Sequence, residues 1–238
     1  MEKIDPSHGL GTLAIHATEG DNPYNTNVTP IYQSAIYRIP DVATGAAIFQ
    51  REDPGYVYTR LSNPTLDQVA GKLAVLEGVD LLRKSPDRPV EEVVRGRVFA
   101  SGMAAITTAI LAKVPRDGVV IAQEALYSRT HTFLREAERY GFRVVWLTNP
   151  SLDDWEVAFA SEPTACLAYV ETPVNPGMAV MDIAAVVEIA HRHNAWVMVD
   201  NTFATPYCQR PLTLGADLVV HSTTKYLGGH GVVTGGVV

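Results

Sequence analysis

The sequence predicts an α/β protein, in which a mostly parallel sheet with helices on both faces follows an extended N-terminal arm. From Arg97 onward, short apolar runs alternate with stretches in which apolar residues recur every three or four positions. Such alternation of strands and helices is typical of a parallel sheet covered on both faces. The segment 1–60 has weak periodicity and many turn-forming residues. We therefore predict an arm over 1–60 and a large domain over 61–238.

The composition is that of a globular enzyme. Of the 238 residues, 47% are hydrophobic and 19% are charged. The formal net charge of -7 argues against a nucleic-acid surface and against binding to an anionic membrane. The sequence shows neither a signal-peptide pattern nor a membrane-spanning apolar run. The two cysteines, Cys166 and Cys208, indicate a reducing compartment, so we predict a cytoplasmic protein that binds neither nucleic acid nor membrane.

The first predicted helix follows the arm. Asn63 followed by Pro64 predicts an N-cap with proline at the first helical position. Apolar residues then fall on one helical face, namely Leu66, Val69, Ala70 and Leu73. Gly78 is expected to end this helix, and the charged stretch 79–96 is expected to be a surface segment.

Tyr58 and Arg60 lie just before this helix. On extended backbone, residues two apart point the same way. An arginine fork beside a phenol is a good phosphate clamp, although a surface salt bridge explains Arg60 equally well. The residues alone leave both alternatives open.

The remaining elements alternate along the chain. Strands are expected at 97–100, 119–122, 142–147, 165–170, 196–199, 218–220 and 232–238. Helices are expected to start after Ser101, Ser151 and Asp182, of which the last two are predicted caps. A further helix is expected to end at Gly141, and one of its faces would consist of Thr130, Phe133, Leu134 and Ala137.

Polar side chains gather where two of these strands end. Asp200 and Thr202 follow the strand 196–199, while Ser222, Thr224 and Lys225 follow the strand 218–220. In open α/β sheets the ligand crevice lies beyond the carboxyl ends of the strands, so these groups should converge. Such a set suits a lysine that forms a Schiff base with an aldehyde cofactor, with hydroxyls on its phosphate and the aspartate on its ring nitrogen. A solvated loop lysine and a helix-capping aspartate are the alternatives for each residue alone.

Other positions contribute weaker signals. Ser101 and Gly102 lie between a strand and a helix, where free backbone N–H groups can bind an anion. Tyr127 follows the strand 119–122 and could stack on a flat ring or belong to the core. His191 and His193 diverge on a helix, which makes a zinc pair improbable. The sequence contains no G-x-G-x-x-G after a strand, no phosphate loop of the G-x-x-x-x-G-K-[ST] type and no G-x-S-x-G.

Five motifs in order resemble those of one enzyme family. They are Tyr58-Thr59-Arg60, Ser101-Gly102-Met103, Glu171-Thr172-Pro173, Val199-Asp200-Asn201-Thr202 and His221-Ser222-Thr223-Thr224-Lys225-Tyr226. With them, residues from about Thr12 to Val238 resemble the Cys/Met-metabolism, or trans-sulfuration, family of pyridoxal-phosphate enzymes. The resemblance implies the large domain of an aspartate-aminotransferase-like transferase and pyridoxal 5'-phosphate as cofactor.

The resemblance also implies roles for individual residues. Lys225 would hold the cofactor and shuttle protons, Asp200 would keep the pyridine nitrogen protonated, and Tyr127 would stack on the ring and assist proton transfer. The phosphate would be bound by Gly102, Met103, Ser222 and Thr224. Asn175 would lie near the ring oxygen and Thr202 near the ring.

In this family Tyr58 and Arg60 would reach the phosphate of a neighbouring subunit, which implies a homodimer or homotetramer. The sequence departs from the family at two points. Arg129 stands where methionine γ-lyases typically carry cysteine, and the C-terminal small domain, with its arginine for the substrate carboxylate, is absent from the sequence. The large domain is therefore expected to be incomplete.

The resemblance implies γ-replacement or γ-elimination on a small amino-acid substrate, which would be a homoserine ester, cystathionine or methionine. The alternative is a truncated, non-catalytic module that binds pyridoxal phosphate or dimerises. Replacement and elimination would use the same residues, so the sequence separates them poorly.

Overall fold

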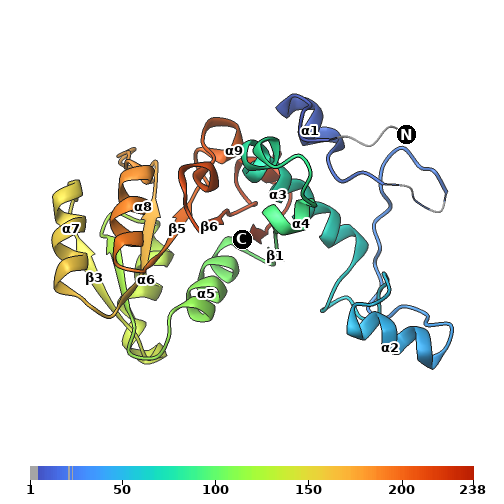
Figure 1. The fold of residues 1–238 in the computed structure, drawn as a ribbon, viewed down its shortest axis with the longest axis horizontal. Coiled ribbons are helices and arrows are strands. Elements are labelled where there is room, and N and C mark those ends of the chain that lie inside the picture. The colour runs from blue at the N-terminus through green and yellow to red at the C-terminus, as the bar shows by residue number, and fades with distance from the viewer. Residues whose placement is uncertain (1–4, 21, 23) are drawn as a thin grey trace.

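The computed structural model describes residues 5–20, 22 and 24–238. Its main sheet has five parallel strands in the order β3-β2-β4-β5-β6. Figure 1 shows β3, β5 and β6 of this sheet in the left half of the molecule. These strands are β2 (Val119–Gln123), β3 (Arg143–Leu147), β4 (Ala165–Glu171), β5 (Trp196–Asp200) and β6 (Leu218–Val220). The predicted α/β fold with a mostly parallel sheet is confirmed.

Two short strands extend this arrangement. β1 (Val98–Phe99) pairs antiparallel with β7 (Gly236–Val237), and a bridge from His221 to Val237 joins β7 to the end of β6. Both strands are shorter than expected. Val232 and Val233, for which a strand was also expected, are exposed, and only Gly236 and Val237 pair with β1.

Helices cover both faces of the sheet. α5 (Gly102–Lys113) and α6 (Ser128–Arg135) lie on one face, and α7 (Leu152–Ser161) and α8 (Ile183–Arg192) lie on the other. Val119 and Ile121 pack with Trp155 of α7, whereas Val120 packs with Ile110 of α5. Successive strand residues thus enter opposite cores, which is why the central strands are apolar throughout.

The predicted helix starts are confirmed. The Asn63 side chain accepts a hydrogen bond from Thr65 N at 2.9 Å. Ser151 forms a capping box with Asp154, and Asp182 accepts from Ala185 N at 3.0 Å. The helix expected to reach Gly141 divides instead into α6 and the short 3-10 helix η1 (Ala137–Tyr140).

The helix after Asn63 is longer than expected. α3 (Pro64–Lys84) continues through Gly78, so the prediction that Gly78 ends it is wrong. A Cβ at Gly78 would lie 2.8 Å from Cγ1 of Val94, which shows that the glycine permits close packing inside the helix. Val79 and Leu82 are buried, so the surface segment begins only after Lys84 and contains α4 (Val90–Val93).

The buried face of α3 also differs from the predicted one. Leu66 is 43% exposed and Val69 is 44% exposed, although both were expected to face the core. The buried residues of α3 are Ala70, Ala74, Val75, Glu77, Gly78, Val79 and Leu82. Segments remote in sequence thus decide which face of this helix is covered.

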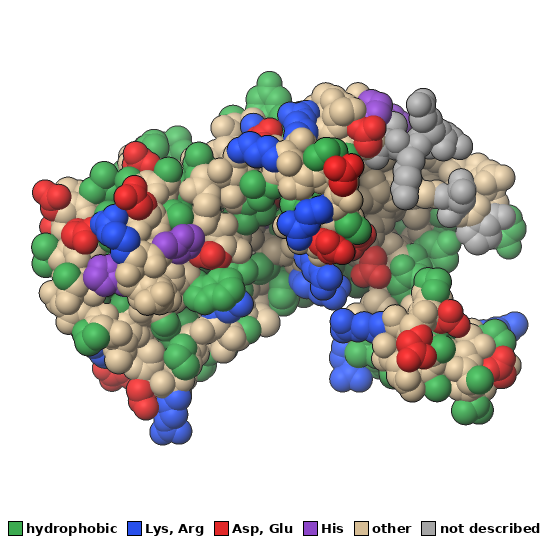
Figure 2. Space-filling model, viewed as in Figure 1, with side chains coloured by type: hydrophobic (Ala, Val, Ile, Leu, Met, Phe, Trp, Pro, Cys, Tyr) green, Lys and Arg blue, Asp and Glu red, His purple; other side chains and the backbone are tan. Residues whose placement is uncertain are grey.

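The N-terminal segment is only partly packed on this chain. α1 (Leu10–His16) and the residue after it bury Leu13 and Ala17 against α3. α2 (Val42–Gln50) projects away from the rest of the molecule (Figures 1 and 2). Large apolar side chains are exposed along this segment, among them Tyr24, Val28, Ile31, Ile36, Val42 and Phe49.

Three short helices follow the last long strands. They are α9 (Thr205–Cys208), η2 (Pro211–Leu214) and η3 (Tyr226–Gly228). No helix among the described residues combines the length and apolar character needed to cross a membrane.

Candidate active site

The ends of β4, β5 and β6 border a cleft of about 210 Å³ together with the start of α5. The cleft is lined by Ser101, Gly102, Met103, Ile106, Tyr127, Glu171, Pro173, Asn175, Asp200, Thr202, Phe203, Ser222, Thr224, Lys225 and Thr234. Every predicted site residue except Tyr58 and Arg60 is among them. The crevice therefore lies where a parallel sheet predicts it, at the carboxyl ends of the strands.

Asp200 is the last residue of β5 and is 6% exposed. Its Oδ1 accepts hydrogen bonds from Thr202 N at 3.1 Å and Thr202 Oγ1 at 2.6 Å, and its Oδ2 accepts from Tyr169 Oη at 3.3 Å. Burial raises the pKa of Asp200, while the bonds from Thr202 oppose that shift. A cationic group in the cleft would favour the charged carboxylate.

The start of α5 offers donors for an anion. Ala104 N binds Ser101 Oγ and Ala105 N binds Ser101 O, both at 3.1 Å, so these two N–H groups are satisfied by the cap. The first N–H groups of a helix have no partner within the helix, which leaves those of Gly102 and Met103 for a ligand.

Glycine at position 102 brings this helix start against the end of β6. A Cβ there would lie 2.6 Å from Cβ of Ser222 and 2.9 Å from its Cα, so no other residue fits without a shift of backbone. Ser222 and Thr224 line the same cleft as Gly102. N–H groups and hydroxyls are thus combined in a cradle suited to a phosphate.

Lys225 lies five residues after β6 and is exposed. It is the one lysine among the described residues that line the cleft. Among the described residues no hydrogen bond or ion pair is formed by its Nζ, so the amine is available for a ligand.

Glu171 is a site residue to which the sequence analysis gave no role. It ends β4, lines the cleft and is 6% exposed. Its Oε2 accepts from Tyr127 N at 2.7 Å and its Oε1 accepts from Asn175 N at 3.1 Å. One carboxylate thereby fixes the backbone at two predicted cofactor contacts. The sequence signal that could have identified Glu171 was its position at the end of an apolar strand.

Tyr127 is 39% exposed, so the alternative of a core tyrosine is wrong. Tyr58 and Arg60 lie away from the cleft and are also exposed. Arg60 lies in a turn and not on extended backbone, yet its Cζ lies 5.2 Å from the centroid of the Tyr58 ring. Within the described part of the chain Arg60 forms no ion pair, which leaves the salt-bridge alternative without support.

Known proteins are similar to this chain in sequence and in fold. The model of the family described as "Cys/Met metabolism PLP-dependent enzyme" matches residues 11–238. The chain belongs to this family. The L-methionine γ-lyase of Porphyromonas gingivalis is 41% identical over 232 residues, which is 97% of this chain and 54% of that protein. The homocysteine/cysteine synthase of Kluyveromyces lactis is 36% identical over 238 residues, covering 98% of this chain and 50% of that protein.

Solved structures of similar proteins share the fold. The metB protein of Corynebacterium glutamicum has a TM-score of 0.84 and 33% identity, covering 98% of this chain and 56% of that one. The metY protein of Campylobacter jejuni has a TM-score of 0.85 and 29% identity, covering 97% and 52%, and its structure contains N'-pyridoxyl-lysine-5'-monophosphate. The chain spans about half the length of the curated relatives it matches.

Pyridoxal phosphate, the cofactor of this family, fits the cleft residues. The amine of Lys225, the buried acid of Asp200 and the cradle beside Gly102 match the aldehyde, the ring nitrogen and the phosphate in chemical type. In the described residues no group of three or more histidine, cysteine, aspartate or glutamate side chains could hold a metal ion. His191 instead contacts Asp217 at 3.0 Å.

Glu171 should make the stability of this family member depend on pH. Burial, and then the charge of Asp200, raise its pKa from 4.5 to about 7. The folded chain therefore holds a proton that the unfolded chain has released, so the free energy of unfolding should fall as pH rises from 4.5 to 7. The expected loss is about 3 kcal/mol.

Urea unfolding of the cofactor-free chain across this pH range measures the effect. Glu171→Gln is the matched variant, because it keeps an oxygen acceptor but cannot titrate. The difference in unfolding free energy between wild type and variant should change with pH in that window. Parallel pH curves for the two proteins would show that the Glu171 pKa is ordinary.

Proposed function

We propose that this chain carries the cofactor site of an enzyme that performs γ-replacement or γ-elimination on a homoserine ester, cystathionine or methionine. The observation that supports this most is that one cleft gathers Lys225, Asp200 and the anion cradle at Gly102. Family membership supports the reaction class.

Each residue has a physical task in this proposal. Pyridoxal phosphate, when bound, supplies an electron sink for the charge left on the substrate Cα. Lys225 would attach the cofactor and move the proton at Cα, because it is the one lysine among the described residues of the cleft. Asp200, held by Thr202 and Tyr169, would keep a proton on the ring nitrogen.

The other predicted residues would orient the cofactor. Gly102, Met103, Ser222 and Thr224 would bind the phosphate, Thr202 would lie near the ring, and Asn175 would lie near the ring oxygen. Tyr127 would stack on the ring and assist proton transfer at the leaving group. Glu171 would fix the backbone of Tyr127 and Asn175.

Substrate choice is the finer part of the proposal. Named relatives include both a methionine γ-lyase and a homocysteine/cysteine synthase. Arg129, in the first turn of α6, stands where methionine γ-lyases typically carry cysteine. The arginine favours γ-replacement on a homoserine ester over strict γ-elimination from methionine.

An assay tests the function. The protein loaded with pyridoxal phosphate should convert O-acetylhomoserine and sulfide to homocysteine faster than it releases methanethiol from methionine. The opposite preference would overturn the choice of substrate. Cofactor binding without turnover of any of these substrates would favour the alternative, a non-catalytic module that binds pyridoxal phosphate or dimerises.

We also propose that residues 1–60 form an arm that contacts a neighbouring subunit, beside a large domain over 61–238. The apolar side chains exposed along the arm and the position of Arg60 away from its own cleft support this. The oligomer would be a homodimer or homotetramer, and the cysteine usage favours the cytoplasm.

Mixed oligomers test the arm directly. Lys225→Ala and Arg60→Ala subunits should each have little activity alone. If Arg60 serves the neighbouring site, a hybrid dimer keeps one intact site, so unfolding and refolding an equal mixture should restore about a quarter of wild-type activity. If Arg60 served its own chain, every site in the hybrid would lack one residue and no activity would return. Lys225→Ala mixed with wild type provides the control for subunit exchange.

A further inference from the structure

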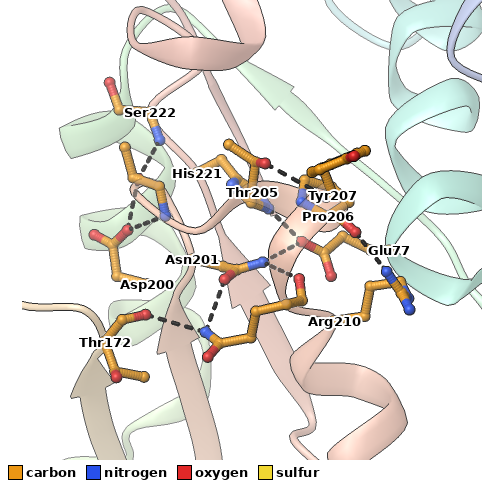
Figure 3. A network of polar contacts seen from close by, with 12 residues as sticks. Glu77, Thr172, Asp200, Asn201, Thr205, Pro206, Tyr207, Arg210, His221 and Ser222 are labelled. Atoms are coloured by element: carbon orange, nitrogen blue, oxygen red, sulfur yellow. Dashed lines mark hydrogen bonds and ion pairs between the residues drawn. The ribbon is translucent and has the colours of Figure 1, made fainter. Parts of the chain in front are cut away.

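A buried polar cluster lies behind the cleft, between α3 and the ends of β5 and β6 (Figure 3). Glu77 of α3 is its centre. Its Oε1 lies 2.5 Å from His221 Nε2 and accepts from Asn201 Nδ2 at 2.7 Å. Glu77 is 5% exposed, His221 is 2% exposed and Asn201 is fully buried. A single carboxylate oxygen therefore joins two strand ends to a helix from a distant part of the sequence.

The two strand ends that Glu77 joins are those that carry the site. Asn201 directly follows Asp200, and His221 directly precedes Ser222. Neighbouring residues on extended backbone point to opposite sides, so Asp200 and Ser222 can face the cleft while Asn201 and His221 face α3. On the cleft side, Thr202 Oγ1 bonds to both Asp200 Oδ1 and Ser222 N, at 2.6 and 2.9 Å.

The cluster extends to the third strand that borders the cleft. Asn201 Nδ2 also donates to Gln209 O at 2.9 Å, and Gln209 Nε2 donates to Thr172 O at 3.0 Å, just beyond β4. Figure 3 shows Glu77, Asn201 and Thr172 in the same network of polar contacts. Removing the acceptor at Glu77 would take away one protein partner each from the buried Asn201 and His221 side chains, so the strand ends would no longer be held to α3 through them.

We propose that Glu77 is a positioning residue of the cofactor site, which holds Asp200 and Ser222 at their spacing through Asn201 and His221. The inference rests on the proposed function. Glu77 would thereby align Asp200, the partner of the ring nitrogen, with Ser222 at the phosphate. Its helix, α3, contributes none of the described residues that line the cleft.

A second contact of the same helix supplies a matched control. Asp80, one turn beyond Glu77, binds Arg210 Nε at 2.6 Å through its Oδ2. This pair also ties α3 to the chain that follows β5, but among the described residues it forms no hydrogen bond or ion pair with Asn201 or His221. Loss of Asp80 therefore loosens the helix without releasing the strand ends.

The experiment compares Glu77→Ala, Glu77→Gln and Asp80→Ala with wild type. Each protein is titrated with pyridoxal 5'-phosphate, and the circular dichroism of the bound cofactor is recorded in its visible absorption band. Glu77→Ala is expected to weaken binding at least about tenfold and to change the sign or intensity of the band. Glu77→Gln retains an oxygen acceptor and is expected to stay within about threefold of wild type, as is Asp80→Ala.

The outcomes separate the inference from the proposed function. A wild-type chain that fails to bind pyridoxal phosphate overturns both. Wild-type binding with an unchanged Kd and dichroism in Glu77→Ala, or equal effects in Asp80→Ala, overturns the inference alone. If Glu77→Ala does not fold, Asn201→Ala cuts the same link from the strand side and is judged by the same criteria.

Discussion

Lys225→Ala is expected to abolish covalent attachment of pyridoxal phosphate and to lower activity at least about a thousandfold. The reason is that, in the part of the chain that the structure describes, no lysine other than Lys225 lines the cleft and could attach the aldehyde. Binding should weaken but persist, because the N–H groups and hydroxyls of the phosphate cradle remain. Borohydride reduction followed by peptide mass spectrometry measures the attachment.

Lys84→Ala is the control for this variant. Lys84 is an exposed residue in the last turn of α3 and does not line the cleft. The Lys84→Ala variant should take up the borohydride-fixed cofactor as wild type does and should have wild-type activity. Equal borohydride labelling of Lys225→Ala and wild type would assign the attachment to another lysine and contradict the site.

Asp200→Asn is expected to lower activity by about two to three orders of magnitude. An amide keeps the acceptor for Thr202 but cannot balance a positive charge on the ring nitrogen. Steady-state rates with the preferred substrate measure the loss. Because burial raises the pKa of Asp200, the carboxylate is disfavoured in the folded chain, so the neutral variant should unfold at no lower urea concentration without cofactor.

Asp182→Asn is the matched control, since it makes the same change at the N-cap of α8. Asparagine caps a helix as well as aspartate does, and Asp182 does not line the cleft. Its activity should therefore be unchanged. If Asp200→Asn kept wild-type rates, the aspartate would not be the partner of the ring nitrogen.

Local sequence signals predicted the parts of the structure that depend on strand ends and helix caps. Asp200 and Lys225 follow buried apolar runs, and parallel strands bring their carboxyl ends to one edge, so convergence could be expected. The caps at Asn63 and Ser151 were predictable because an N-cap bonds within its own first turn.

Gly78 and Glu171 show where such reasoning stops. A glycine can end a helix or allow a neighbouring side chain to pack closely against it. At Gly78 the close packing of Val94 shows that the second applies. Glu171 binds N–H groups 44 residues before and 4 residues after it, which no sequence spacing indicates. Both depend on packing between remote segments.

By itself, the sequence determined the α/β class, the alternation of elements, the family and the residues at the strand ends, because these depend on periodicity, caps and short motifs. The tertiary structure alone decided which face of α3 is buried, that Glu171 joins Tyr127 to Asn175, and that Glu77 fixes two strand ends from behind. The physical reason is that burial and hydrogen bonding of a side chain are set by its neighbours in space, and these come from parts of the chain more than a hundred residues apart, as with Glu77 and His221.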